Sequence, residues 1–116
     1  MNFALVFFGG GMGCVVRYLI GLGFQKTTAT LPWATFLSNI TACLVFALVV
    51  WIASTKEVMT PTLKLMLLTG FCGGLSTFSS FGYETFLLLK QSLYLYAFLN
   101  ILISCSLCIF IFYIFN

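Results

Sequence analysis

The stretch from residue 70 to 81, GFCGGLSTFSSF, brings glycines, hydroxyls and aromatic rings together inside a long apolar run. Ser79 and Ser80 carry hydroxyl groups, and Phe78 and Phe81 stand three residues apart beside them. A hydroxyl donates a hydrogen bond to an anion, and the positive edge of an aromatic ring attracts one without a formal charge. The stretch therefore has the chemistry of a site for a small anion, although the 14 phenylalanines of the chain also favour ordinary packing.

Small and polar residues elsewhere recur every four positions, which places them on one face of a helix. In the first apolar run, Arg17 continues a four-residue spacing that begins with two glycines. The glycines by themselves indicate close packing between helices. An arginine within a span costs about 2.5–3.5 kcal/mol, so it indicates a function unless its side chain reaches the nearer interface. Asn39 in the second run and Asn100 with Ser104 in the fourth add donors. Each of these helix faces, called here stripes, can be explained by packing alone. Together, however, the hydrogen-bond donors and the positively charged Arg17 favour a path for an anion.

These residues lie on segments that we expect to be membrane-spanning helices. Of the 116 residues 62% are hydrophobic and 6% are charged, and the mean hydropathy is +1.17, whereas soluble domains carry about 25% charged residues. A helix needs about 20 apolar residues to cross the hydrocarbon core, and four runs qualify, at about 3–24, 33–54, 63–89 and 93–115. We expect an all-α integral membrane protein with a single domain over residues 1–116. Its first run is interpreted as a span and not as a signal peptide.

The third run is longer than one span requires. Its midpoint is Ser76, just after Gly73 and Gly74, which both weaken a helix. A break at this depth releases backbone groups that survive only when protein or a wet cavity surrounds them, and such breaks often form ion sites. We therefore expect the third helix to be broken near the membrane midplane, with tilting of an unbroken helix as the alternative.

The lysines do not favour one orientation in the membrane. With four spans, Lys56 and Lys64 lie on the side of both termini, and Lys26 and Lys90 lie on the opposite side. Because the Lys/Arg bias sets orientation, two lysines against two specify none. Insertion in both orientations, and pairing of the two as an antiparallel dimer, is the favoured interpretation. The alternative is that one weak signal decides the orientation.

Catalytic and metal-binding residue types are scarce. The chain has no histidine and two carboxylates, so no nucleophile, base or metal cluster can be assembled, and we expect no enzyme. All five cysteines lie in apolar runs, including the CxxC of Cys105 and Cys108. They are interpreted as soft packing residues and not as disulfides or a redox site.

The motif GFCGGLSTFSSF, with GGGMGCVVRY near the N-terminus, Asn39 in the second run and NILIS in the fourth, resembles the Fluc (CrcB) family of fluoride channels. The resemblance covers nearly the whole chain, and the third-run motif is specific. It implies a fluoride-selective channel that passively exports F⁻ from the cytoplasm across the prokaryotic plasma (inner) membrane, with no nucleic-acid partner. It also implies an antiparallel homodimer with two pores, each lined by both subunits.

The resemblance further implies roles for individual residues. A structural Na⁺ at the dimer axis would be held by the backbone carbonyls of Gly73 and Ser76 from both chains. The anion pathway would be lined by side chains from all four runs: Arg17, Asn39, Phe78, Phe81, Ser79, Ser80, Asn100 and Ser104. Cys108 departs from the family, which commonly has glycine or serine at that position.

Two other classes remain as alternatives. A small multidrug-type transporter also has four spans and dual topology, but it needs a carboxylate in the first span, where this chain has Arg17. A membrane assembly subunit would explain the stripes of small residues, but it would not explain a helix broken at the midplane.

Overall fold

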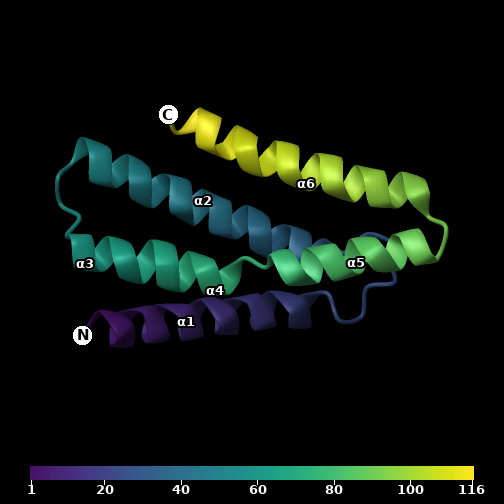
Figure 1. The fold of residues 1–116 in the computed structure, drawn as a ribbon, viewed down its shortest axis with the longest axis horizontal. Coiled ribbons are helices and arrows are strands. Elements are labelled where there is room, and N and C mark those ends of the chain that lie inside the picture. Colours follow the sequence, from purple (N-terminus) through teal and green to yellow (C-terminus); the bar gives the residue numbers. More distant parts are fainter.

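The computed structural model describes residues 1–116, and every regular element is a helix. Four segments are long and apolar enough to cross a membrane: α1 (Asn2–Gly23), α2 (Trp33–Thr55), the third segment Pro61–Lys90, and α6 (Tyr94–Ile114). Their bounds lie within two residues of the expected runs. The four segments run alongside one another along the 49 Å axis of the molecule (Figure 1). The expected all-α membrane architecture is confirmed.

The third segment is interrupted, as expected. It consists of α3 (Pro61–Lys64), the π-helical η1 (Leu65–Cys72), α4 (Gly73–Leu75) and α5 (Phe78–Lys90). Between α4 and α5, Ser76 and Thr77 are extended, with ψ angles of 153° and 116°. Figure 1 shows this break as a short non-helical link between the labels α4 and α5. The third helix is therefore broken, and tilting of a continuous helix is excluded.

The glycines of the motif do not themselves form the break. Gly73 keeps helical angles, with φ −64° and ψ −35°, and the chain leaves the helix only after Leu75. Gly74 has a packing role instead, because an added Cβ would meet the carbonyl oxygen of Gly10 in α1. A Cβ on Gly13 would likewise meet the carbonyl oxygen of Phe71. Glycine thus lets α1 and the first half of the third segment touch backbone to backbone.

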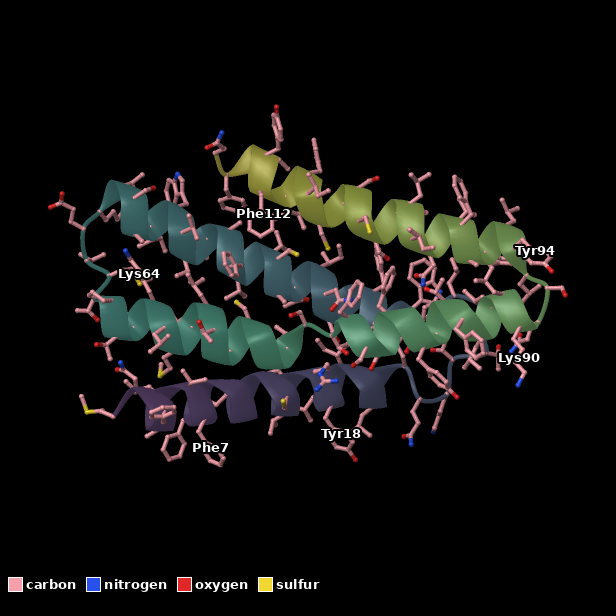
Figure 2. All side chains as sticks on the ribbon, in the orientation of Figure 1. Phe7, Tyr18, Lys64, Lys90, Tyr94 and Phe112 are labelled. Carbon is pink, nitrogen blue, oxygen red and sulfur yellow. The ribbon has the colours of Figure 1, made fainter.

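The two ends of the molecule carry equal numbers of lysines. Both termini and the 56–60 connection lie at one end, called here the terminal side, and the other two connections lie at the opposite end (Figure 1). Figure 2 shows Lys64 and Lys90 at opposite ends. Lys56 belongs to the terminal side and Lys26 to the opposite side.

Most of the surface is apolar. Only 16 of 116 residues are buried, and large side chains such as Phe7 and Tyr18 project away from α1 (Figure 2). Inside, Phe46 of α2 and Phe112 of α6 pack edge to face with ring centroids 5.6 Å apart. An apolar exterior of this extent suits lipid or another membrane protein.

Candidate ion site at the broken helix

Asn39 of α2 holds the break in the third segment. The backbone N–H of Thr77 donates to the Asn39 side-chain oxygen at 2.7 Å, and the Asn39 amide donates to the Thr77 carbonyl at 3.3 Å. An extended residue at this depth has no helical partners, so these two bonds satisfy backbone groups that lipid cannot satisfy. The structure therefore places Asn39 at the break, where its first task is to hold the backbone.

The same arrangement releases two backbone carbonyls. In a continuous helix Thr77 N–H would bond to the Gly73 carbonyl and Ser80 N–H to the Ser76 carbonyl. Instead, Thr77 N–H bonds to Asn39, and Ser80 N–H donates to the Thr77 hydroxyl at 3.2 Å. Gly73 and Ser76 are both exposed on the chain, so their carbonyls leave the helical ladder on an accessible face.

The break also brings opposite helix ends together. The carbonyl end of the helical stretch from Pro61 to Leu75 lies directly before the N-terminal end of α5. A helix carries a partial negative charge at its C-terminus and a partial positive charge at its N-terminus. One position in the span therefore offers carbonyl oxygens suited to a cation and N–H groups suited to an anion.

The expected ring pair lines a cavity beside the break, called here the ring cavity. The centroids of Phe78 and Phe81 are 6.0 Å apart, with 37° between the ring planes. The cavity has a volume of about 240 Å³, and Asn39 and Ser104 also contribute to its wall. Phe78 is 85% exposed in the single chain, so one ring of the pair has no cover from its own chain.

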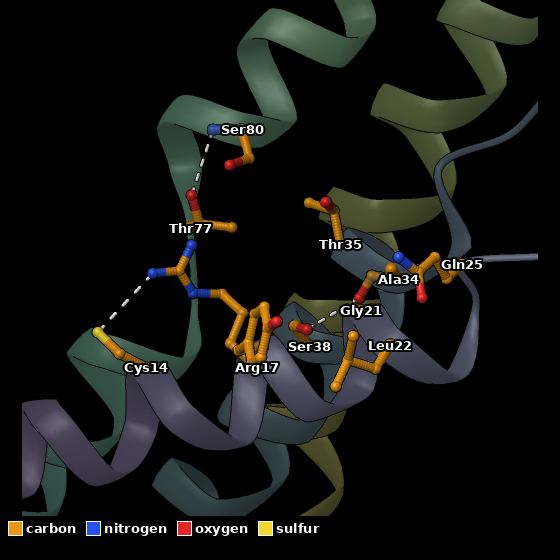
Figure 3. A pocket seen from close by; sticks show the side chains of 11 residues that line it. Cys14, Arg17, Gly21, Leu22, Gln25, Ala34, Thr35, Ser38, Thr77 and Ser80 are labelled. Carbon is orange, nitrogen blue, oxygen red and sulfur yellow. Dashed lines mark hydrogen bonds between the residues drawn. The ribbon is translucent and has the colours of Figure 1, made fainter.

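A second cavity, called here the arginine cavity, has a volume of about 450 Å³ and is lined by Arg17 and Ser80 among others. Figure 3 shows the Arg17 guanidinium directed toward Thr77, which lines both cavities. Arg17 Nε donates to the Gly74 carbonyl at 3.1 Å. The side chain therefore bonds to the third segment beside the break.

The remaining candidates form a hydrogen-bonded row between α5 and α6. Asn100 donates to the Thr85 hydroxyl at 2.9 Å, and Ser104 contacts the Asn100 oxygen at 3.5 Å. Asn100 and Ser104 are buried, and Ser104 reaches the ring cavity whereas Asn100 does not line it. Ser79 is exposed, with its hydroxyl 3.4 Å from that of Thr77. Apart from Ser79, which lines neither cavity, the candidate side chains thus divide between the two cavities and the row behind them.

Two residues that line these cavities were not among the site residues predicted from the sequence. Thr77 links the cavities and caps α5, and Thr35 donates to a Glu84 carboxyl oxygen at 2.7 Å. The other oxygen of Glu84 is buried and has no hydrogen-bond partner. Thr35 lies four residues before Asn39, so its helical spacing was the available signal.

Comparison with known proteins places the chain in a family. The model of the family described as CrcB-like protein, Camphor Resistance (CrcB), matches residues 4–115. The chain belongs to the CrcB family. This family member is 43% identical over 97 residues to the fluoride-specific ion channel FluC of Flavobacterium psychrophilum, covering 83% of this chain and 78% of the relative. It is 41% identical over 105 residues to the fluoride-specific ion channel FluC 1 of Streptomyces avermitilis, covering 90% and 84%.

A third CrcB relative, the fluoride-specific ion channel FluC of Geobacter sp. strain M21, is 37% identical over 101 residues, covering 86% of this chain and 82% of the relative. The resemblance stated from the motif is confirmed by these matches. With four spans and relatives in bacteria, this CrcB family member is a multi-pass protein of the plasma membrane.

Proposed function

We propose that this CrcB family member is a fluoride-selective channel that releases F⁻ passively from the cytoplasm. The names of its relatives support the proposal, and one structural observation carries it. At the break, the N-terminal end of α5, the ring cavity and the arginine cavity adjoin at Thr77. A small anion is stabilised here by four kinds of group: a positive helix end, hydroxyl donors, ring edges and a guanidinium. None of these groups needs an acidic residue in order to bind the anion.

The channel works as an antiparallel homodimer with two pores, each lined by both subunits. The released carbonyls of Gly73 and Ser76 and the ring of Phe78 are exposed on the single chain. Lipid cannot satisfy exposed carbonyls near the middle of a span, so protein must cover this face. A second copy in the opposite orientation covers it, and the equal lysine counts at the two ends permit both orientations.

A structural Na⁺ lies between the two copies in this proposal. Backbone carbonyls of unwound helices are ligands that suit Na⁺, and Gly73 and Ser76 have carbonyls freed from the helical ladder. Each copy contributes these two oxygens from the negative end of its first half-helix. When bound, the ion supplies positive charge near the midplane of the dimer.

Fluoride passes each pore through several weak sites. Donors in the first turn of α5, the hydroxyl of Ser80 and the edges of Phe78 and Phe81 together offset the cost of removing water from the ion. Arg17 raises the local concentration of anions in the arginine cavity. The narrow, hydrogen-bonded path favours F⁻ over the larger Cl⁻, and multiple weak sites allow the ion to leave.

Ion efflux from liposomes containing the purified protein tests the proposal. A fluoride electrode and a chloride electrode read the same preparation, and we expect rapid fluoride release with negligible chloride release. Phe78→Ile and Phe81→Ile should abolish fluoride release, because an aliphatic side chain has no positive edge. Phe110→Ile is the matched control, since Phe110 is an exposed ring on α6 outside the ring cavity. Equal fluoride flux in all three variants would remove the rings from the mechanism, and absence of flux from folded wild-type dimer would refute the channel.

A further inference from the structure

Three cysteine thiols line the ring cavity, a feature that fluoride conduction does not require. Cys43 comes from α2, and Cys105 and Cys108 come from α6. All five cysteines of the chain are free thiols. Of the other two, Cys14 lines the arginine cavity and Cys72 is a buried residue at the end of η1 in the third segment. Thiols from two different helices thus meet in one cavity of about 240 Å³.

Geometry limits what these thiols can bind. No group of three or more cysteine, carboxylate or histidine side chains converges closely enough to hold a metal ion, which excludes a tetrahedral zinc site. Cys43 and Cys108 each lie one helical turn before Phe46 and Phe112, whose ring centroids are 5.6 Å apart, so the two residues face one another across α2 and α6 in the same cavity. Both residues are half-buried. Two thiolates on opposing helices satisfy a soft cation of linear coordination, such as Cu(I), Ag(I) or Hg(II), because soft metals prefer sulfur ligands.

The rest of the cavity wall supports this selectivity. It contains no carboxylate and no histidine, so hard divalent cations find no charged oxygen ligand there. Phe78 and Phe81 line the same cavity, and an ion held between the thiols therefore occupies the space beside the ring pair.

We propose that Cys43 and Cys108 form a two-coordinate site for a soft d¹⁰ cation, and that a bound cation closes the ring cavity. On binding, two S–H bonds break, two metal–sulfur bonds form, and two protons pass to water with no change in oxidation state. The binding part stands on the thiol geometry alone. The closing part rests on the proposed fluoride conduction through the same cavity.

Mercury X-ray absorption tests the site without any need for ion flux. Purified protein in detergent receives one equivalent of HgCl₂ per chain, and the spectrum reports the number of sulfur neighbours. We expect two sulfur neighbours in wild type and in Cys14→Ala, whose cysteine lines the other cavity, and one in Cys43→Ala and in Cys108→Ala. Two sulfur neighbours in either of the last two variants, or one in wild type, would overturn the site.

Fluoride efflux from liposomes tests closure, with each variant compared with its own untreated efflux. HgCl₂ should slow efflux by roughly tenfold or more in wild type and in Cys14→Ala, with recovery after dithiothreitol, because thiols compete for the metal. Cys43→Ala and Cys108→Ala should retain most of their efflux. Equal inhibition in these two variants, or none in wild type that shows two sulfur neighbours, would overturn closure. If untreated wild type releases no fluoride, the proposed function fails, whereas the absorption result still decides the metal site.

Discussion

The two hydrogen bonds between Asn39 and Thr77 hold the broken helix, and Asn39→Ala removes both of them. The substitution leaves the N–H and the carbonyl of Thr77 without their partners near the middle of a span. The break should then lose its defined position, and with it the alignment of the ring cavity and the arginine cavity that adjoin at Thr77.

The cost lies between two limits. Leaving a buried backbone group unsatisfied costs about 1–3 kcal/mol, which gives an upper limit of about 6 kcal/mol for two groups. Interhelical hydrogen bonds in membranes average only about 0.6 kcal/mol each, because the unfolded state in the membrane also finds partners. Thr77 is half-buried beside two cavities, where water can replace part of the amide. We therefore expect a loss of about 2 kcal/mol, near the lower limit and equivalent to about 30-fold in the folding equilibrium.

Unfolding by SDS in mixed micelles measures the free energy, and fluoride efflux from liposomes measures the effect on conduction. Thr41→Val is the matched control, because Thr41 lies two residues further along α2 and its hydroxyl donates to Leu37 of its own helix at 2.7 Å. We expect the control to lose less than about 0.5 kcal/mol and to keep its flux. Asn39→Ala should lose flux by roughly tenfold or more, since several aligned sites share the path. If Asn39→Ala were as stable and as conductive as Thr41→Val, Asn39 would not be what holds the break.

Three further predictions concern topology, helix packing and the cation. Replacing both Lys26 and Lys90 by Gln leaves lysines only on the terminal side, which should force one orientation and abolish efflux. Co-expression with a variant in which Lys56 and Lys64 are replaced by Gln should restore efflux. Efflux from either variant alone would argue against antiparallel pairing. Gly13→Ala should cost about 1–3 kcal/mol in SDS unfolding, because the added Cβ meets the Phe71 carbonyl oxygen. Gly11→Ala, with open space around it, should cost less than about 0.5 kcal/mol; equal costs would contradict the close crossing. Replacing Na⁺ by N-methyl-D-glucamine throughout purification should reduce the dimer fraction on size-exclusion chromatography, because the larger cation cannot bind the released carbonyls. An unchanged dimer fraction would count against a structural Na⁺.

Much of the fold follows from local sequence. The four apolar runs and the short connections between them identify the spans, because lipid leaves a helix few alternatives. The interruption near Ser76 could also be predicted from the sequence, since the third run is too long for one span and carries weak helix formers at its centre. The exact position of the break could not be predicted, because Gly73 and Gly74 remain helical and the extended residues are Ser76 and Thr77. Their conformation depends on Asn39, 38 residues away in the chain.

Composition and local spacing were enough to predict a charge-poor, four-span membrane protein with two lysines at each end and with donors, rings and one arginine on its helical faces. These properties depend on composition and on periods of a few residues, which no tertiary contact changes. Only the packing of the helices shows that Arg17 bonds to Gly74, that Thr77 lines two cavities, and that thiols from α2 and α6 line the same cavity. Such relations join residues of different helices, and their distances depend on how closely the backbones cross at glycine contacts.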